Sequence, residues 1–82
     1  MLIPQQPLTI KNIPSLYARF VATIDQGQNT TLDLSNVSEV DSSGIALILE
    51  LKQVAKNKNC TLSIDNPSPA ILRLCNLYKI NF

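Results

Sequence analysis

Four side chains in the middle of the chain have types and positions that could do chemistry. Asp33 lies in a short alternating segment, and Asp41, Ser42 and Ser43 follow it as a continuous run. A serine hydroxyl can accept a phosphoryl group, which adds a charge of about −1.5 to −2. Two carboxylates brought together could act as acid and base or hold Mg²⁺. The residues therefore raise two hypotheses, a regulatory serine and a carboxylate site.

The rest of the chain lacks the usual parts of an enzyme. It contains no His and only two glycines, so no Gly-rich phosphate loop is present, and neither cysteine has a candidate base beside it. Nothing near the two aspartates resembles a substrate pocket, so Asp33 is better explained as a residue that orders the following connection. Cys60 and Cys75 have no neighbouring His or Cys and are expected to be buried free thiols. We therefore predict no catalytic residue, no metal site and no cofactor.

Composition limits the class of protein. The chain has 82 residues, of which 45% are hydrophobic and 16% are charged, with a net charge of +1. This length predicts a single globular domain over residues 1–82, and the near-neutral charge argues against a nucleic-acid partner. The longest apolar run, residues 45–49, is far shorter than the ~20 residues of a membrane-spanning helix. We expect a cytoplasmic protein that reaches a membrane only through a partner.

Periodicity predicts alternating strands and helices. Three segments alternate between apolar and polar residues, and three have apolar residues at helical spacing. The expected elements are a short strand at 8–10, a helix at 14–26, a strand at 30–35, a helix from 45 to about 58 preceded by capping residues, a strand at 60–65, and a helix at 69–78.

The faces of these elements predict how they pack. Both longer strands have one polar face, so helices should cover one side of the sheet only. The order of elements demands parallel pairing through right-handed crossovers. The fold class is therefore α/β, a two-layer sandwich with a mostly parallel sheet and its helices on one face. The expected core face of the middle helix is Leu47, Ile48, Leu51 and Ala55, and that of the last helix is Ile71, Leu72, Leu74, Cys75 and Tyr78.

The segment from the second strand into the middle helix resembles a known family. Leu32-Asp33-Leu34-Ser35 followed by Asp41-Ser42-Ser43-Gly44 is similar to the signature of STAS domains, the sulfate-transporter and anti-sigma-factor antagonist family, over about residues 14–80. The resemblance implies a two-layer STAS sandwich that binds other proteins. It also implies that Ser42 is the candidate phosphoacceptor, with Ser43 next.

The residues themselves leave two interpretations of this segment open. In the first, Asp41, Ser42 or Ser43 simply caps the helix, which stabilises it by ~1 kcal/mol. Alternatively, a phosphate on Ser42 would place negative charge on an exposed docking surface. Gly44 costs up to ~1 kcal/mol in a helix relative to Ala, so it needs a close approach by another backbone, either from the protein's own core or from a partner. Asp33, Asp41 and Gly44 are thus interpreted as residues that order the loop.

The stripe of the middle helix beside its predicted core face indicates a docking surface. We expect Ile45 and Leu49 to point away from the core. An apolar pair beside a modifiable serine, continued by two bases, suits protein docking. The predicted partner-binding residues are Ser42, Ile45, Leu49, Lys52 and Lys56.

Two subfamilies compete for the assignment. The opening of the middle helix and the ending Leu72–Tyr78 resemble the small STAS subunit of the bacterial lipid-asymmetry (Mla) ABC transporter. That resemblance implies binding to the cytosolic ATPase subunit at the inner membrane. Ser42-Ser43-Gly44 is closer to anti-sigma-factor antagonists, whose partner is an anti-sigma factor kinase. A third alternative is a domain that dimerises through an exposed sheet edge.

The start of the chain departs from the family pattern. Family members usually have more strand before the first helix, and here only residues 8–12 are available for it. Either an edge strand has been lost or residues 2–10 supply a shortened substitute.

Overall fold

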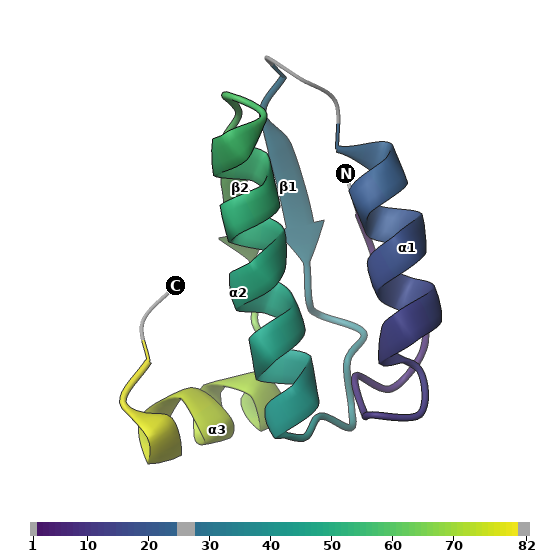
Figure 1. Ribbon diagram of the computed structural model, residues 1–82. Coiled ribbons are helices and arrows are strands. Elements are labelled where there is room, and N and C mark those ends of the chain that lie inside the picture. Colours follow the sequence, from purple (N-terminus) through teal and green to yellow (C-terminus); the bar gives the residue numbers. More distant parts are fainter. Residues whose placement is uncertain (1, 25–27, 81–82) are drawn as a thin grey trace.

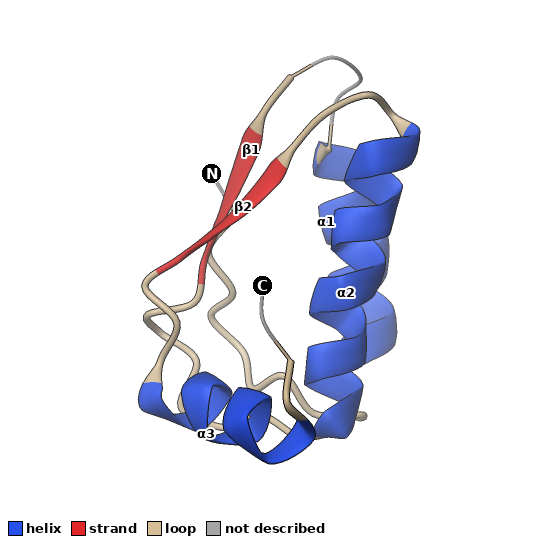
Figure 2. Ribbon diagram, turned by 90° about the vertical axis from the view of Figure 1, so that its left-hand side faces the viewer, coloured by secondary structure: helices blue, strands red, loops and turns tan. Residues whose placement is uncertain are grey.

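The computed structural model describes residues 2–24 and 28–80, and these form an α/β unit. In chain order the elements are α1 (Ile13–Thr23), β1 (Thr30–Asp33), α2 (Ser42–Asn57), β2 (Leu62–Asp65) and α3 (Pro69–Tyr78). β1 and β2 pair in parallel, with Leu32 opposite Ile64. Figure 2 shows α1 and α2 on the same side of the two strands, and α3 across one end of the molecule. The predicted α/β class and parallel pairing are confirmed.

The polar face of the sheet has no covering helix in the described part of the chain (Figure 2). Ser63 and Asp65 are exposed on this face, and Thr31 and Asp33 are half-buried. The alternating residues Leu32 and Leu62 are buried beneath the helices. The period-two pattern therefore determines which side of the sheet the helices cover.

The start of the chain corrects one prediction. No strand forms at residues 8–10, because Thr9 accepts a hydrogen bond from the N–H of Asn12 (2.9 Å) and the chain turns there. Leu2 and Leu8 instead form single parallel bridges, to Leu32 and Val40. Prolines at positions 4 and 7 have no N–H to donate, so a continuous ladder is not available. Residues 2–10 thus supply the shortened substitute for an edge strand.

The three helices match their expected positions, with small shifts at their ends. Pro14 lies in the first turn of α1. The helix ends at Thr23 because the backbone of Ile24 is extended, so the predicted end at residue 26 is wrong. α3 begins with the Ser68 hydroxyl accepting from the N–H of Ile71 (3.4 Å) and ends at Tyr78, as predicted. No helix in the described part is long and apolar enough to cross a membrane.

The core lies between the helices and the sheet. All four residues of the predicted core face of α2 are buried, which confirms that part of the analysis. Lys58, just after α2, donates from Nζ to the carbonyl oxygens of Val21 (3.2 Å) and Ile24 (2.9 Å). The Val21 carbonyl also accepts from the N–H of Ile24 (3.3 Å), and the ammonium group of Lys58 adds a favourable positive charge at this C-terminal end of α1 and ties the two helices together.

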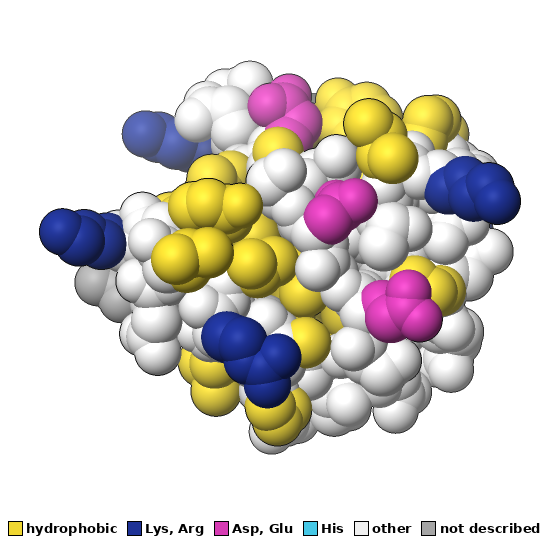
Figure 3. All heavy atoms as spheres, turned by 90° about the horizontal axis from the view of Figure 1, so that it is seen from below, with side chains coloured by type: hydrophobic (Ala, Val, Ile, Leu, Met, Phe, Trp, Pro, Cys, Tyr) yellow, Lys and Arg dark blue, Asp and Glu magenta, His cyan; other side chains and the backbone are white. Residues whose placement is uncertain are grey.

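Fewer side chains of α3 are buried than predicted. Ile71 and Cys75 are buried and Leu74 is half-buried, but Leu72 is 50% exposed and Tyr78 is 46% exposed. The prediction that Leu72 and Tyr78 pack inward is therefore wrong. The reason is that α3 crosses the end of the molecule and meets the core along one stripe. Figure 3 views the molecule from this end and shows hydrophobic side chains gathered on the surface there.

Candidate functional site

The start of α2 is organised by Asp41. Its Oδ1 accepts hydrogen bonds from the N–H groups of Ser43 (2.9 Å) and Gly44 (3.3 Å), and its Oδ2 accepts from the N–H of Ile10 (3.2 Å). Asp41 is therefore the N-cap of α2 and also fixes the segment before α1. Of the three residues that the sequence offers as caps, Asp41 is the N-cap, and Ser42 and Ser43 are the first two residues of the helix.

Gly44 lies where the chain before α1 passes closest to α2. A Cβ at this position would meet the carbonyl oxygen of Leu8 and would lie 2.7 Å from both Leu8 Cβ and Val40 Cγ2. The backbone of Leu8 is held there because its N–H donates to Glu39 O (2.9 Å) and its carbonyl accepts from Asp41 N–H (3.1 Å). The close backbone approach expected for this glycine thus comes from the protein's own core.

The two candidate phosphoacceptors differ in exposure. Ser42 is exposed as the first residue of α2, whereas Ser43 is half-buried. Ser43 lies in a groove of about 420 Å³ between α1 and α2, with Ala46 and Glu50 on the α2 side. The groove is largely apolar, and on the other side it is lined by Ile10, Ile13, Pro14 and Tyr17. Ser42 is therefore the more accessible of the two hydroxyls.

Asp33 orders the turn that follows β1. Its Oδ1 accepts a hydrogen bond from the N–H of Ser35 (2.9 Å). The backbone hydrogen bond from Ser35 is the main cause that lowers the pKa of Asp33, and side-chain hydrogen bonds from Ser35 and Asn66 add to it. The carboxylate is thus kept ionised by donors that hold the connection toward α2. Asp33 and Asp41 each have their own backbone donors, which supports loop ordering for both.

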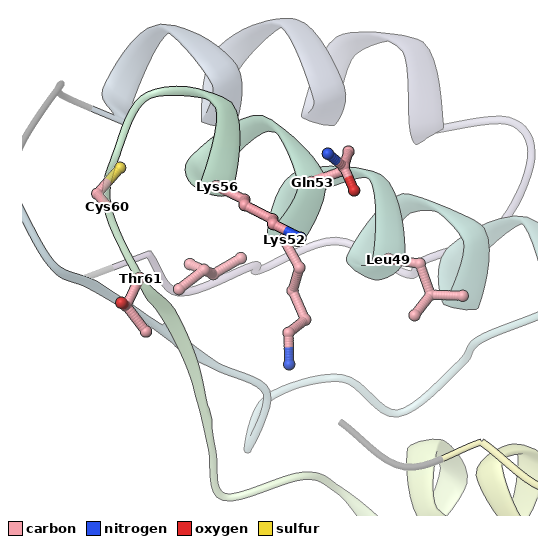
Figure 4. Close-up of a pocket in the computed structure, with 7 residues that line it drawn as sticks. Leu49, Lys52, Gln53, Lys56, Cys60 and Thr61 are labelled. Atoms are coloured by element: carbon pink, nitrogen blue, oxygen red, sulfur yellow. The ribbon is translucent and has the colours of Figure 1, made fainter.

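Leu49, Lys52 and Lys56 share a second groove with β2. Together with Gln53 they form its α2 side, and Cys60, Thr61 and Leu62 form the strand side, around a volume of about 420 Å³. Figure 4 shows these side chains on α2 and on the segment leading into β2. Leu49 is 43% exposed and Lys56 is exposed, while Lys52 is half-buried. Three of the five predicted partner-binding residues therefore lie in one groove.

Ile45 does not belong to this surface. Its side chain is only 3% exposed and is part of the hydrophobic core, so the prediction that it points outward is wrong. α3 lies beside the first turns of α2, as Figure 1 shows. The periodicity of one helix does not show which of its residues a later element of the chain will bury. The exposed line along α2 is therefore Ser42, Leu49 and Lys56, with Lys52 at its edge.

Sequence reasoning missed two features of the site. The first is the contribution of residues 8–10, which contact the start of α2 through Leu8 and Ile10. The second is the strand wall of the Leu49 groove, formed by residues 60–62. Gly44 was the available signal for the first, because a glycine in a first helical turn requires a close neighbour. No comparable signal exists for the second.

Comparisons with known proteins identify the family of the chain. Two curated proteins named intermembrane phospholipid transport system binding protein MlaB, from Escherichia coli K12 and Shigella flexneri, are each 35% identical to the chain over 51 residues. The match covers 62% of this chain and 53% of each relative, so it spans about half the length of those proteins. No solved structure matches the chain. A family model described as "Mlab, STAS domain" matches residues 7–81. The chain therefore belongs to the STAS domain family, in the group that this description names.

Proposed function

We propose that this domain is a non-catalytic, protein-binding subunit of a phospholipid-transporting ABC system, and that it binds the cytosolic ATPase subunit and supports its assembly and activity. The family assignment over residues 7–81 carries the proposal. Both curated relatives are named as binding proteins of an intermembrane phospholipid transport system. In this role the domain is cytoplasmic and lies at the inner membrane through the transporter complex.

The proposed docking surface is the exposed line of α2 formed by Ser42, Leu49 and Lys56, with the half-buried Lys52 at its edge. The fold does not use these side chains for its own core: Leu49 is 43% exposed, and Ser42 and Lys56 are exposed. An exposed leucine flanked by polar and basic residues has the character of an interface anchor. The buried residues on the opposite stripe of α2 hold the helix in place and thereby fix the orientation of this surface.

Ser42 is proposed as the regulatory position of this surface. The N–H groups of Ser43 and Gly44, which would attract an anion, already bind the Asp41 carboxylate. A phosphate on Ser42 would be repelled by that carboxylate and would project its charge toward the partner. Phosphorylation is therefore expected to change docking more than folding.

Copurification with the ATPase subunit tests the proposal. The affinity-tagged domain, produced in the cell that encodes it, is expected to retain an ABC ATPase subunit. Ser42→Glu should weaken that binding about tenfold, because it adds a negative charge at the interface. Ser42→Ala, the matched control, should bind as the unchanged protein does, and circular dichroism should report the same helix content for all three.

Retention of an anti-sigma factor kinase, with no ATPase subunit, would overturn the proposal in favour of the anti-sigma-factor antagonist. Neither curated relative is named for that function. Equal binding by the Ser42→Glu and Ser42→Ala proteins would remove Ser42 from the docking surface.

A further inference from the structure

The edge of β2 that faces away from β1 has free backbone groups in the described part of the chain. On the β1 side, Thr30 N–H donates to Thr61 O (2.9 Å). Hydrogen bonds along a parallel pair use alternate residues, so Leu62 and Ile64 point their N–H and C=O groups away from β1. Among the residues that the structure describes, no backbone group pairs with them there. Such an edge is a template for a further strand.

Two copies of this edge complement each other in an antiparallel arrangement. The outward groups of Leu62 in one copy meet those of Ile64 in the other, and each such pair exchanges both of its N–H···O bonds. The reverse pair forms at the same time, because a two-fold axis relates the copies and passes beside Ser63. The paired side chains, Leu62 and Ile64, are both apolar and lie on the helix side of the sheet.

The position of α2 fits this pairing. Figure 1 shows α2 in front of the two strands, and Figure 2 shows that it lies with α1 on one side of the sheet. Edge-to-edge pairing would separate the α2 helices of the two copies by about two strand spacings, ~10 Å. Helices that pack against each other are about 8–10 Å apart. Leu49, which is 43% exposed on this flank of α2, would be buried between them.

Unlike charges meet at both ends of the antiparallel pair. Lys56 lines the groove at the start of β2 together with Thr61, and Asp65 is the last residue of the strand. The same register sets Asp65 of one copy opposite Thr61 of the other, at the end of the edge where Lys56 lies. In the described part of the chain, Lys56 and Asp65 form no ion pair, whereas Lys52 has an interaction of its own. Lys56 and Asp65 are therefore the charges that the two copies bring together.

We propose that two copies of this domain pair through their β2 edges, antiparallel and about a two-fold axis, into one continuous sheet with α1 and α2 of both copies on the same face. The edge fits a second copy because it complements itself in hydrogen bonding, apolar contact and charge. β2 is only four residues long, so the dimer is weak, with a Kd on the order of 100 μM.

This pairing does not depend on the proposed transporter function. Leu49 and Lys56 also belong to the proposed docking surface, however. The paired domain and the ATPase-bound domain are therefore alternative states.

Amide hydrogen exchange, followed by NMR in the purified domain, tests the pairing. Raising the concentration from about 20 μM to about 1 mM should slow exchange at Leu62 and Ile64 about fourfold, because the paired fraction rises. The amides of Ser63 and Asp65 face β1 and should exchange at unchanged rates, so they serve as internal controls.

Charge reversal at the two ends tests the antiparallel register. Lys56→Glu and Asp65→Lys should each raise the dissociation constant about tenfold, because like charges then meet at both ends. A mixture of these two variant proteins restores unlike charges at both ends, so it should associate as tightly as the unchanged protein. Sedimentation equilibrium measures the association, and circular dichroism confirms that each variant keeps its helix content.

Glu50→Lys is the matched control for net charge. It makes the same change of charge as Asp65→Lys, on an exposed residue of α2 that faces the α1 groove and lies outside the β2 groove. Its dissociation constant should stay within about threefold of that of the unchanged protein.

Three results would overturn the inference: exchange at Leu62 and Ile64 that does not depend on concentration, self-association that leaves both amides unchanged, or a mixture of the two variants that associates no better than either alone. The first would leave the edge to a different polypeptide, and the second would assign the dimer to another face. Because only the purified domain is used, failure of this test leaves the copurification result standing, and loss of copurification leaves the dimer result standing.

Discussion

Gly44→Ala is expected to lower the free energy of unfolding by about 3 kcal/mol, as overpacking of a tightly filled site does. The added methyl group would overlap the carbonyl oxygen and Cβ of Leu8 and the side chain of Val40. The backbone of Leu8 cannot move away freely, because its N–H and carbonyl both bind the segment before α2. Urea denaturation followed by circular dichroism measures this change.

Ser42→Thr is the matched control for that experiment. It adds one methyl group to the same helical turn at an exposed position, so its effect should stay within about 0.5 kcal/mol. If the Gly44→Ala protein is as stable as the unchanged protein, residues 8–10 do not approach α2 as described. The proposed way in which the start of α2 holds Ser42 at the surface would then be wrong.

Leu49→Lys should weaken binding to the ATPase subunit by about 100-fold or more, while leaving the fold intact. A charge replacing an apolar anchor at an interface loses the apolar contact and leaves an ammonium group to be desolvated. Leu49 is 43% exposed and contributes little to the domain's own core, so the free energy of unfolding should change by less than about 1 kcal/mol. Isothermal titration calorimetry and urea denaturation of the purified domain separate the two effects.

Ala22→Lys controls for the added charge. Ala22 is exposed on α1, away from the proposed surface, and its replacement should leave affinity unchanged. Equal loss of binding in both proteins would attribute the effect to net charge. Unchanged binding of the Leu49→Lys protein would exclude this leucine from the interface.

Local signals in the sequence predicted most of the fold. Apolar spacing identified the buried stripe of α2, and Ser68 with Pro69 identified the start of α3, because capping and first-turn proline depend only on nearby residues. The alternating strands predicted which face of the sheet the helices cover. Gly44 predicted a close backbone neighbour without showing which segment supplies it.

The errors arose where distant segments meet. Ile45 was placed outside because a single helix gives no information on the cover that α3 provides at its first turn. Leu72 and Tyr78 were placed inside because an apolar stripe does not show how much of it the core can contact. Likewise, the groove beside β2 joins residues of α2 to residues 60–62, and no spacing rule connects those two segments.

Site-specific photocrosslinking in living cells tests the central claim most directly. A photoreactive amino acid at position 49 should form a crosslink to an ABC ATPase subunit, identified by mass spectrometry, and the same group at position 22 should form none. A crosslink from position 49 to an anti-sigma factor, or equal crosslinking from both positions, would contradict the proposal that the exposed side of α2 binds the transporter.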